Sequence, residues 1–434
     1  MLQKLQNHLN KDLPFLKGKK LLLAVSGGID SMVLVHLLHQ LQFDVSVAHC
    51  NFNLRRDESN GDEEFVKSFC KNLNIGFFVN NFDTKRYADL HKLSIQVAAR
   101  QLRYNWFNEL LEKEGFDYLL TAHHLDDSIE TFLINFTRGT GLDGLTGIPQ
   151  QNDKIIRPFL IFTREEIENY SKENQIEWRE DSSNVSDKYL RNKLRHKVIP
   201  ILKELNPGFS DSFLQTIENL QQSESMIDDA SRIVYRKVVE DVDDQKRINL
   251  SKLMVLPNYQ AYLYQWLKPF GFKAWKDIYD LVEAQSGKQV FSERYRLLKD
   301  RDTLILTEKK EFEKEVYAVY EEAENSKIPL KISVCDKEDI AYGNKDIIFV
   351  DKDTLKFPLE FRKWEEGDYF YPFGITGKKK LSKYFKDEKF SLIEKENTWL
   401  LCSENLVVWL VGKRADRRFS VNEKTQTIIK IELK

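Results

Sequence analysis

One short stretch, from Leu21 to Ser31, constrains the fold of this chain more than any other. The apolar residues Leu21 to Val25 predict a buried strand, and the apolar run after Ser31 predicts a helix, so the strand turns sharply into the helix. The residues of the turn are Ser26, Gly27, Gly28, Ile29, Asp30 and Ser31. Glycines let a backbone approach a ligand closely, and the free N–H groups of a first helical turn attract anions. We therefore expect a pyrophosphate site, with Asp30 as a ligand of Mg²⁺.

The same turn differs from the better-known nucleotide-binding loops. It lacks both G-x-x-x-x-G-K-[ST] and G-x-G-x-x-G, which argues against a phosphate-transferring P-loop and a dinucleotide fold. The string SGGIDS resembles the pyrophosphate (PP) loop of the N-type ATP pyrophosphatases, which attach AMP to a carbonyl or carboxylate oxygen and release pyrophosphate. The resemblance implies ATP and adenylation chemistry, and it leaves the substrate open.

Composition sets the outer limits of the fold. A chain of 434 residues with 31% charged and 41% hydrophobic residues is typical of a soluble globular protein of about three domains. No apolar run approaches roughly 18 residues and no signal peptide is recognisable, so we expect a cytoplasmic protein without a membrane span. The four cysteines lack C-x-x-C spacing, which predicts free thiols. The net charge of -2 means that any nucleic-acid contact must come from local patches.

Residues 1–205 predict an α/β domain. We expect a lead-in helix that stops before Pro14, strands at Leu21–Val25, Phe43–Cys50, Gly76–Val79 and Phe116–Ala122, a short strand within Lys154–Phe162, and helices at Asp62–Leu73, Ile95–Lys113 and Thr163–Asn174. This alternation predicts a doubly wound, Rossmann-like parallel sheet. We expect a loop at Asn51–Asn60, at the ligand-binding edge of the sheet. His49 and Asn51 are therefore candidates for reading a base or ribose, with a structural role for the histidine as the alternative.

A second polar cluster follows the strand Phe116–Ala122. It contains His123, His124, Asp126 and Asp127, which suit a divalent metal, an ammonium group or a general base, with Glu130 as structural support. The glycine-rich segment Arg138–Leu145 predicts a flexible loop that closes over a substrate.

Two pairs of arginines have helical spacing. Arg100 and Arg103 are three residues apart, and Arg191 and Arg195 are four apart, so each pair can share one face of a helix. For the second pair, binding of an ATP or RNA phosphate is one interpretation, and a solvated basic face is the other.

The pattern changes after about residue 205. Helical spacing predicts a helical second domain at 206–315, which ends in a hairpin of Val290–Lys299 against Thr303–Thr307. A small, mostly β third domain is expected at 325–434. Its basic residues among aromatic ones are Lys378, Lys379, Lys380, Lys383, Lys386, Arg414 and Arg417. Such residues bind looped RNA because the cations neutralise its phosphates and the aromatic rings stack on its bases. The alternative interpretation is a lysine-rich loop that only increases solubility.

Several strings together resemble one family over nearly the whole chain. They are SGGIDS at Ser26, TAHHLDDSIET at Thr121, RGTGLDGL at Arg138, RNKLRH at Arg191, and GDYFYPFG followed by KKKLSKYFKD from Gly367. In this order they resemble the bacterial tRNA(Ile)-lysidine synthases. The resemblance implies a ligase that adenylates the C2 oxygen of the wobble cytidine in the CAU-anticodon tRNA(Ile). The ε-amino group of free L-lysine then displaces AMP, which gives lysidine.

The resemblance also implies roles for the phosphate-binding residues. Ser26 to Ser31 bind ATP, Asp30 helps to hold Mg²⁺, and Arg100 with Arg191 or Arg195 stabilises the developing phosphate charge. Arg195 and the C-terminal basic residues contact the tRNA.

Asp126 or Asp127 would orient the lysine ammonium or remove its proton, because an amine must be neutral to attack. One residue departs from the family pattern. Phe52 stands where the family commonly has a histidine, and its side chain forms no hydrogen bond.

Three other classes stay open at this point. A glutamine-dependent ligase would need an N-terminal cysteine and a glutaminase domain, for which the chain has no room. A tRNA thiolase would need catalytic cysteines near the loop, and Cys50 and Cys70 are the candidates. A non-catalytic RNA-binding protein would leave the SGGIDS loop unexplained. The sequence leaves the oligomeric state open, a homodimer included.

Overall fold

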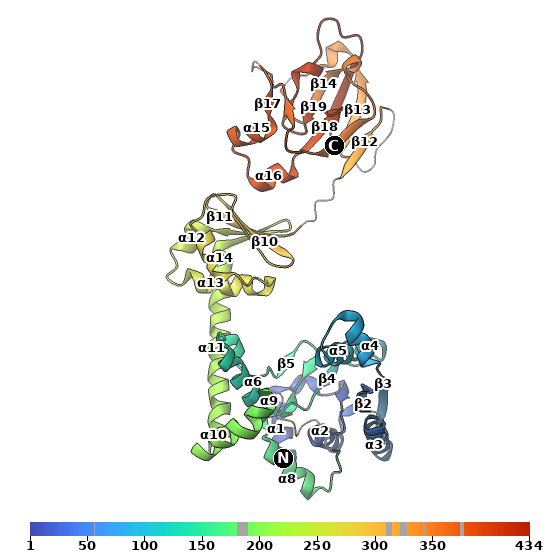
Figure 1. The fold of residues 1–434 in the computed structure, drawn as a ribbon, viewed down its shortest axis with the longest axis vertical. Helices are drawn as coiled ribbons and strands as arrows, with labels where there is room; N and C mark the ends of the chain where they lie inside the picture. The colour runs from blue at the N-terminus through green and yellow to red at the C-terminus, as the bar shows by residue number, and fades with distance from the viewer. Residues whose placement is uncertain (56, 180–189, 310–314, 322–327, 342, 374–376) are drawn as a thin grey trace. The chain divides into compact units, whose positions relative to one another are not determined.

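The structure, a computed structural model, describes the chain except for residues 56, 180–189, 310–314, 322–327, 342 and 374–376 (Figure 1). The described residues form two units, Met1–Ile227 and Asp228–Lys434. The last glycine of the GDYFYPFG string, Gly374, lies outside the described residues.

The first unit is built on a six-stranded sheet of order β3-β2-β1-β4-β6-β5. Its strands are β1 (Lys20–Ala24), β2 (Asp44–Asn51), β3 (Gly76–Asn81), β4 (Tyr118–Leu120), β5 (Gln151–Asn152) and β6 (Ile155–Ile156). All pairs are parallel except β5 with β6. The strand order reverses at β1, which confirms the predicted doubly wound sheet. Ligands of such sheets bind at the carboxyl ends of the strands where the order reverses.

Helices cover both faces of this sheet. The helices of this part of the chain are α1 (Leu2–Asp12), α2 (Ile29–Gln40), α3 (Asp57–Leu73), α4 (Thr84–His91), α5 (Ile95–Lys113), α6 (Leu125–Arg138), α7 (Leu142–Leu145) and α8 (Arg164–Glu173). Successive side chains of a strand point to opposite faces. Accordingly Leu21 and Leu23 pack in the core that contains α1, α2 and α8, whereas Leu22 packs in the core that contains α5. No described helix is both long and apolar enough to cross a membrane.

Most predicted elements of this unit are confirmed, and two predictions are wrong. The helix at Ile95–Lys113 has the predicted bounds, and Thr163 caps α8 in a capping box with Glu166. Asn51–Asn60 is not all loop, because α3 begins at Asp57 and has acidic residues in its first turn, where the helix dipole favours them. Arg138–Leu145 contains the short helix α7, whose Gly144 carbonyl accepts a hydrogen bond from Asn135.

An irregular helix follows the gap at residues 180–189. It consists of α9 (Leu190–Lys193), a π-helical turn (Leu194–Val198) and α10 (Ile199–Leu205), which are contiguous. The long helix α11 (Phe209–Val238) comes next. Phe213 and Ile217 of α11 pack against Leu125 and Ile129 of α6. A separate small core therefore joins α6 to the start of α11.

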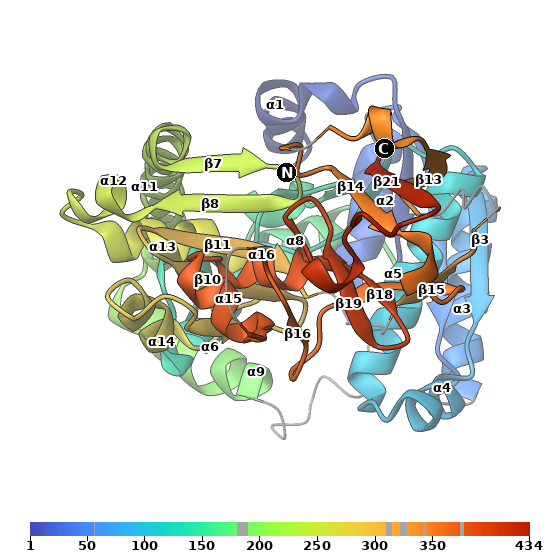
Figure 2. The same cartoon turned by 90° about the horizontal axis from the view of Figure 1, so that it is seen from above.

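The second unit begins with an antiparallel sheet of order β7-β8-β11-β10-β9. Its elements are β7 (Val239–Val242), β8 (Gln245–Asn249), β9 (Gln289–Phe291), β10 (Tyr295–Asp300), β11 (Thr303–Glu308), α12 (Leu250–Met254), α13 (Tyr259–Leu267) and α14 (Trp275–Leu281). Figure 2 shows β7 and β8 side by side. The predicted hairpin is confirmed as β10 and β11, but Val290–Lys299 is not one strand, because it spans β9, a turn and most of β10.

The C-terminal part of this unit is mostly β, as predicted. Its strands are β12 (Val316–Val319), β13 (Leu330–Cys335), β14 (Ile347–Asp351), β15 (Leu359–Lys363), β16 (Tyr369–Phe370), β17 (Lys379–Lys380), β18 (Trp399–Ser403), β19 (Leu406–Leu410), β20 (Arg414–Ala415) and β21 (Ile428–Leu433). The lysine-rich run is not a loop, because it forms β17 and the helix α15 (Leu381–Asp387), which precedes α16 (Leu392–Asn397). Trp409, Phe361 and Ile429 share one buried core.

Candidate active site

The loop Ser26–Ser31 connects β1 to α2 at the position where the strand order reverses. Gly27 has a φ of 93°, which favours glycine, and a Cβ there would lie 3.4 Å from Val66 Cγ2. The Ser26 hydroxyl oxygen accepts a hydrogen bond from the Gly28 N–H at 3.3 Å, and the Ser31 hydroxyl donates to the Gly28 carbonyl at 2.8 Å. These bonds fix the shape of the loop.

The N-terminus of α2 differs from those of α5, α8 and α16. In those three helices Ser94, Thr163 and Ser391 accept hydrogen bonds from N–H groups of the first turn. The N-cap of α2 is Gly28, and no side chain caps this helix. Its first N–H groups can therefore bind an anion, which supports the predicted phosphate site.

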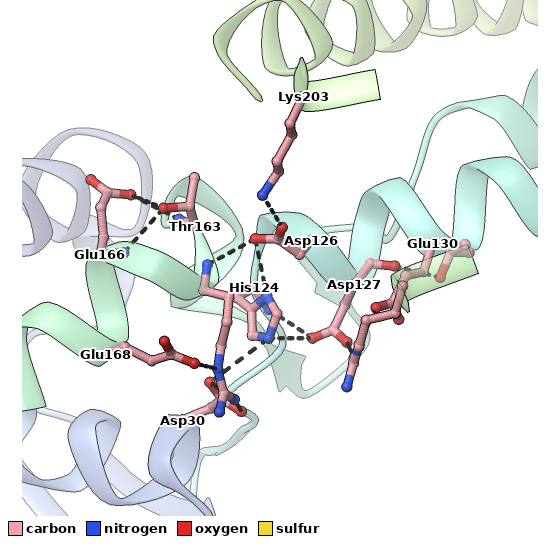
Figure 3. A network of polar contacts seen from close by, with 12 residues as sticks. Asp30, His124, Asp126, Asp127, Glu130, Thr163, Glu166, Glu168 and Lys203 are labelled. Atoms are coloured by element: carbon pink, nitrogen blue, oxygen red, sulfur yellow. Dashed lines mark hydrogen bonds and ion pairs between the residues drawn. The ribbon is translucent and has the colours of Figure 1, made fainter. Parts of the chain in front are cut away.

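A buried network of charged residues centres on His124, next to this loop (Figure 3). His124 Nε2 lies 3.7 Å from Asp30 Oδ1 and 3.5 Å from Asp127 Oδ2, and Nδ1 lies 3.9 Å from Asp126 Oδ2. The Nδ1 atom is buried and has no hydrogen-bond partner among the described residues. The fold thus brings together the two acidic motifs that the sequence analysis singled out, around one imidazole.

Two cations neutralise carboxylates of this network. Arg164 Nη1, at the start of α8, lies 2.7 Å from Asp30 Oδ2, and Lys203 Nζ, on α10, lies 2.7 Å from Asp126 Oδ1. The backbone N–H of Arg164 also donates to Asp126 Oδ2 at 2.8 Å. Opposite charges at this spacing offset the free energy that burial of a carboxylate costs.

Glu130 joins Arg191 and Arg195. Its side chain is fully buried, and it accepts hydrogen bonds from Arg191 Nε at 2.7 Å and from Arg195 Nε at 2.5 Å. The same guanidinium groups lie 3.8 and 3.6 Å from Asp127 Oδ1. The predicted shared face of the two arginines is therefore confirmed, and it points to α6. Their side chains keep 43% and 39% of their surface exposed, so each guanidinium can also meet a phosphate.

Burial and neighbouring charges shift the pKa values of this network in different directions. Burial raises the pKa of Asp30 although His124 and Arg164 oppose it. Burial alone would also raise the pKa of Asp126 and Asp127. For Asp126 the hydrogen bonds from Lys203 and Arg164 outweigh burial, and for Asp127 the charge of His124 contributes most, so both pKa values are lowered. Asp126 and Asp127 are consequently ionised at neutral pH.

Burial lowers the pKa of His123 to about 4, so this imidazole is neutral at neutral pH. Its Nδ1 lies 2.8 Å from the Thr121 hydroxyl.

His49 and Asn51 lie at the end of β2 and are both buried. His49 Nδ1 is 2.9 Å from the Val25 carbonyl, and burial lowers the pKa of His49. The Asn51 side-chain NH₂ donates to Asn60 and Glu63 of α3. Both residues hold together the elements that surround the loop, and a contact with a base or ribose stays a prediction.

Arg100 lies outside the His124 network. Its guanidinium is 4.8 Å from the ring centroid of Tyr104, and in the described part of the chain it forms no ion pair with α6. The neighbouring Arg103 lies 5.1 Å from the ring centroid of Phe52, which stacks on Phe82. Phe52 therefore contacts a guanidinium through its ring face.

Sequence reasoning missed Arg164 and Lys203. Arg164 is 134 residues from Asp30, and Lys203 is 77 residues from Asp126. Neither belongs to a motif. The one available signal was the capping box at Thr163, which fixes the start of α8 and so places the Arg164 N–H.

Apart from Arg195, which lies in the first unit, the predicted RNA contacts lie in the C-terminal part of the second unit. Lys378 is 5.0 Å from the ring centroid of Tyr369, and Arg417 is 5.7 Å from that of Tyr371. Lys379 is less available, because it pairs with Asp387 at 2.8 Å. The other predicted residues are the exposed Lys380, Lys383 and Lys386 and the half-buried Arg414. We call Lys378, Lys380, Lys383, Lys386 and Arg417 the basic surface; its contact with RNA stays a prediction.

The cysteines provide no reactive thiolate near the loop. All four are free, and burial raises the pKa of Cys50 and of Cys70 to about 12. Both are therefore protonated at neutral pH, which argues against a thiolase.

Residues 1–202 match the family described as the PP-loop domain, in agreement with the position of the uncapped loop in the sheet. The first unit is thus of the PP-loop class of ATP-using enzymes. Residues 241–309 match the TilS substrate binding domain, and residues 359–433 match the TilS substrate C-terminal domain.

Full-length relatives make the assignment specific. The tRNA(Ile)-lysidine synthase of Parabacteroides distasonis is 40% identical over 97% of this chain and 95% of that protein. The synthases of Bacteroides thetaiotaomicron and Bacillus subtilis are 38% and 31% identical, over 98% and 95% of this chain and 98% and 93% of the relatives. The chain belongs to the tRNA(Ile)-lysidine synthase family.

Among solved structures, the U34-tRNA thiolase NcsA from Methanococcus maripaludis aligns with 51% of this chain and 77% of its own. Its sequence identity is 21% and the TM-score is 0.43, so no argument rests on this likeness.

Proposed function

We propose that this protein is a ligase that joins free L-lysine to C2 of the wobble cytidine in tRNA(Ile) with a CAU anticodon, with ATP as co-substrate. The products are lysidine in the tRNA, AMP and pyrophosphate. The observation that carries the proposal is the position of the His124 network beside an uncapped PP-loop, in a chain that aligns with lysidine synthases over nearly its whole length. A cytoplasmic location and a homodimer stay predictions from sequence.

The ATP phosphates bind at the N-terminus of α2. Mg²⁺ in nucleotide sites takes one or two carboxylates together with phosphate and water oxygens, and Asp30, at the end of the loop, fits the carboxylate position. Such an ion would neutralise charge on the pyrophosphate.

In the first step the C2 oxygen of the cytidine forms a bond to the α-phosphorus, and the bond to pyrophosphate breaks. Negative charge moves onto the leaving pyrophosphate. Arg191 and Arg195 are suited to stabilise it, because Glu130 holds both guanidinium groups in place while part of each stays exposed.

In the second step the lysine ε-amine forms a bond to C2, and the bond from C2 to the oxygen of AMP breaks. The attacking ammonium must first lose a proton. Asp127 is a better candidate than Asp126 for this role. Both oxygens of Asp126 already accept hydrogen bonds, from Lys203 and Arg164, whereas Asp127 Oδ1 has only longer contacts among the described residues.

The test is incorporation of radiolabelled lysine into an unmodified CAU-anticodon tRNA(Ile) transcript, with and without ATP. ATP-dependent incorporation that disappears in Asp30→Ala is the expected result. If lysine is not incorporated but ATP is still cleaved to AMP and pyrophosphate, the adenylation step stands and the assignment of lysine as the nucleophile is wrong. Absence of both reactions would overturn the proposed function.

A further inference from the structure

Lys203 is linked to the candidate active site through Asp126 (Figure 3). The Lys203 ammonium donates a hydrogen bond to Asp126 Oδ1 at 2.7 Å, and the Arg164 N–H donates to Asp126 Oδ2 at 2.8 Å. The Asp126 side chain is only 12% exposed. With both oxygens engaged, Asp126 acts as a fixed negative charge and is not an open ligand for a substrate.

This contact depends on the π turn between α9 and α10. Arg191 and Lys203 are twelve positions apart. In a regular α-helix, with about 100° per residue, Lys203 would lie about 120° around the helix from Arg191. A π turn has i→i+5 hydrogen bonds and uses more residues per turn, which rotates the residues after it back toward the face of Arg191. Arg191 and Lys203 indeed both contact α6, at Glu130 and Asp126.

Pro200 explains why the π turn occurs at this position. Proline has no N–H group, and in an α-helix its ring collides with the carbonyl four residues earlier, here that of His196. The turn Leu194–Val198 ends just before this proline, and the Ile199 N–H bonds to the Leu194 carbonyl, five residues earlier. Pro200 therefore forces a departure from α-helical geometry just before Lys203, and this departure turns Lys203 toward α6.

Asp126 in turn faces His124. Its Oδ2 lies 3.9 Å from His124 Nδ1, a buried atom without a hydrogen-bond partner among the described residues. The other ring nitrogen of His124 lies between Asp30 and Asp127. A shift of Asp126 would therefore move the imidazole relative to two other carboxylates. These are Asp30 in the ATP loop and Asp127, which is proposed to remove the proton from lysine.

We propose that Lys203 is a positioning residue for lysidine formation: the π turn brings it to Asp126, and through Asp126 it fixes the His124 imidazole between the two other carboxylates. Lys203 itself touches no substrate. This inference rests on the proposed function. A purely structural link between α10 and α6 would affect the stability of the fold and leave the turnover of folded molecules unchanged.

The first experiment compares Lys203→Met with Lys203→Arg in steady-state lysine incorporation. We expect Lys203→Met to lower kcat about tenfold to a hundredfold, with KM for tRNA within about twofold, because a small misplacement of reacting groups has effects of this size. Lys203→Arg keeps a cation and should recover kcat to within about threefold. Lys113→Met breaks an exposed ion pair with Glu109 on α5 and should leave kcat unchanged.

The second experiment uses Pro200→Ala. Alanine has a high helix propensity, which offsets the loss of the Lys203–Asp126 pair, so this variant should be about as stable to heat as the wild type. Its kcat should still fall at least about fivefold as the π turn relaxes and Lys203 rotates away. A stable variant with a lowered kcat would show that the π turn positions Lys203 for turnover and is not needed only for folding.

Folded Lys203→Met with wild-type kcat would overturn the role of Lys203, as would a Lys203→Arg variant that is no better than Lys203→Met. Wild-type kcat in Pro200→Ala would overturn the part assigned to the π turn. The wild type serves as the separate check on the proposed function. If it incorporates no lysine, that function falls and the role of Lys203 falls with it.

Discussion

The two units of the chain place their charged side chains in opposite settings. In the first unit, Glu130 and Asp126 are buried, Asp30 and Asp127 are half-buried, and each has a defined partner. In the second unit, the basic surface is exposed, and two of its residues, Lys378 and Arg417, lie over aromatic rings. Buried ion pairs hold geometry and lose much when one partner is removed, whereas exposed charges contribute little each and are screened by salt. The comparison predicts that the first unit governs turnover and the basic surface governs affinity for tRNA.

The largest effect is expected at Asp30. Asp30→Ala should lower ATP-dependent lysine incorporation by roughly 10³-fold, because it removes the candidate Mg²⁺ ligand and leaves Arg164 and His124 without this carboxylate. AMP release should fall in parallel. Glu168→Ala is the matched control, since Glu168 is the other acidic partner of Arg164, and it should stay within about threefold of wild type. A loss of less than tenfold in Asp30→Ala would contradict the assignment.

Glu130→Gln is expected to affect both turnover and stability. It leaves two guanidinium groups against a neutral, buried amide, so kcat should fall about a hundredfold. The free energy of unfolding should decrease by about 1–3 kcal/mol, less than for a fully buried pair because both arginines are partly exposed. Urea unfolding measures the second effect. The exposed control Glu109→Gln should cost less than about 0.5 kcal/mol, and equal losses in the two variants would break the comparison.

The surroundings of Asp30 and Glu130 also show which features of the site the sequence could predict and which it could not. The strand, turn and helix from Leu21 onward depend on local patterns, and so does the shared face of Arg191 and Arg195. The pairing of Arg164 with Asp30 and of Lys203 with Asp126 joins distant segments. Such pairings depend on the tertiary packing of α8 and α10, which local sequence patterns do not predict.

The helix continues past Pro200 through a π turn, and contacts of Arg191 and Lys203 with α6 stabilise both of its ends. These contacts join segments that are distant in the sequence.

The basic surface should act on affinity alone. Replacing Lys380, Lys383 and Lys386 by alanine together should raise KM for tRNA about tenfold and leave kcat within about twofold. The dependence of tRNA binding on salt should become shallower by roughly 0.7–0.9 in log units for each lost phosphate contact. Lys424→Ala, elsewhere on the C-terminal part, is the control and should change neither value. A fall in kcat with unchanged KM would contradict the division of roles.

A smaller effect is expected from His123. Its pKa is about 4 in the folded protein and 6.5 for an ordinary histidine, so between these pH values only the unfolded chain binds the proton. Stability should therefore be complete above pH 6.5 and decrease as the pH falls toward 4. His123→Asn should flatten this part of the profile in urea unfolding, whereas the exposed His91→Asn should not. An unchanged slope in His123→Asn would show that its burial does not govern the titration.

The smallest effect is expected at the buried cysteines. The double variant Cys50→Ala/Cys70→Ala should keep lysine incorporation within about twofold, because thiols with a pKa of about 12 provide no thiolate at neutral pH. Loss of the buried Cys70 sulfur should cost about 1 kcal/mol of stability. Loss of incorporation by the folded double variant would reopen thiol chemistry. Burial alone thus keeps an ionisable group neutral, as in the Cys70 thiol, whereas burial with hydrogen bonds from charged partners, as in Asp126, keeps the group ionised.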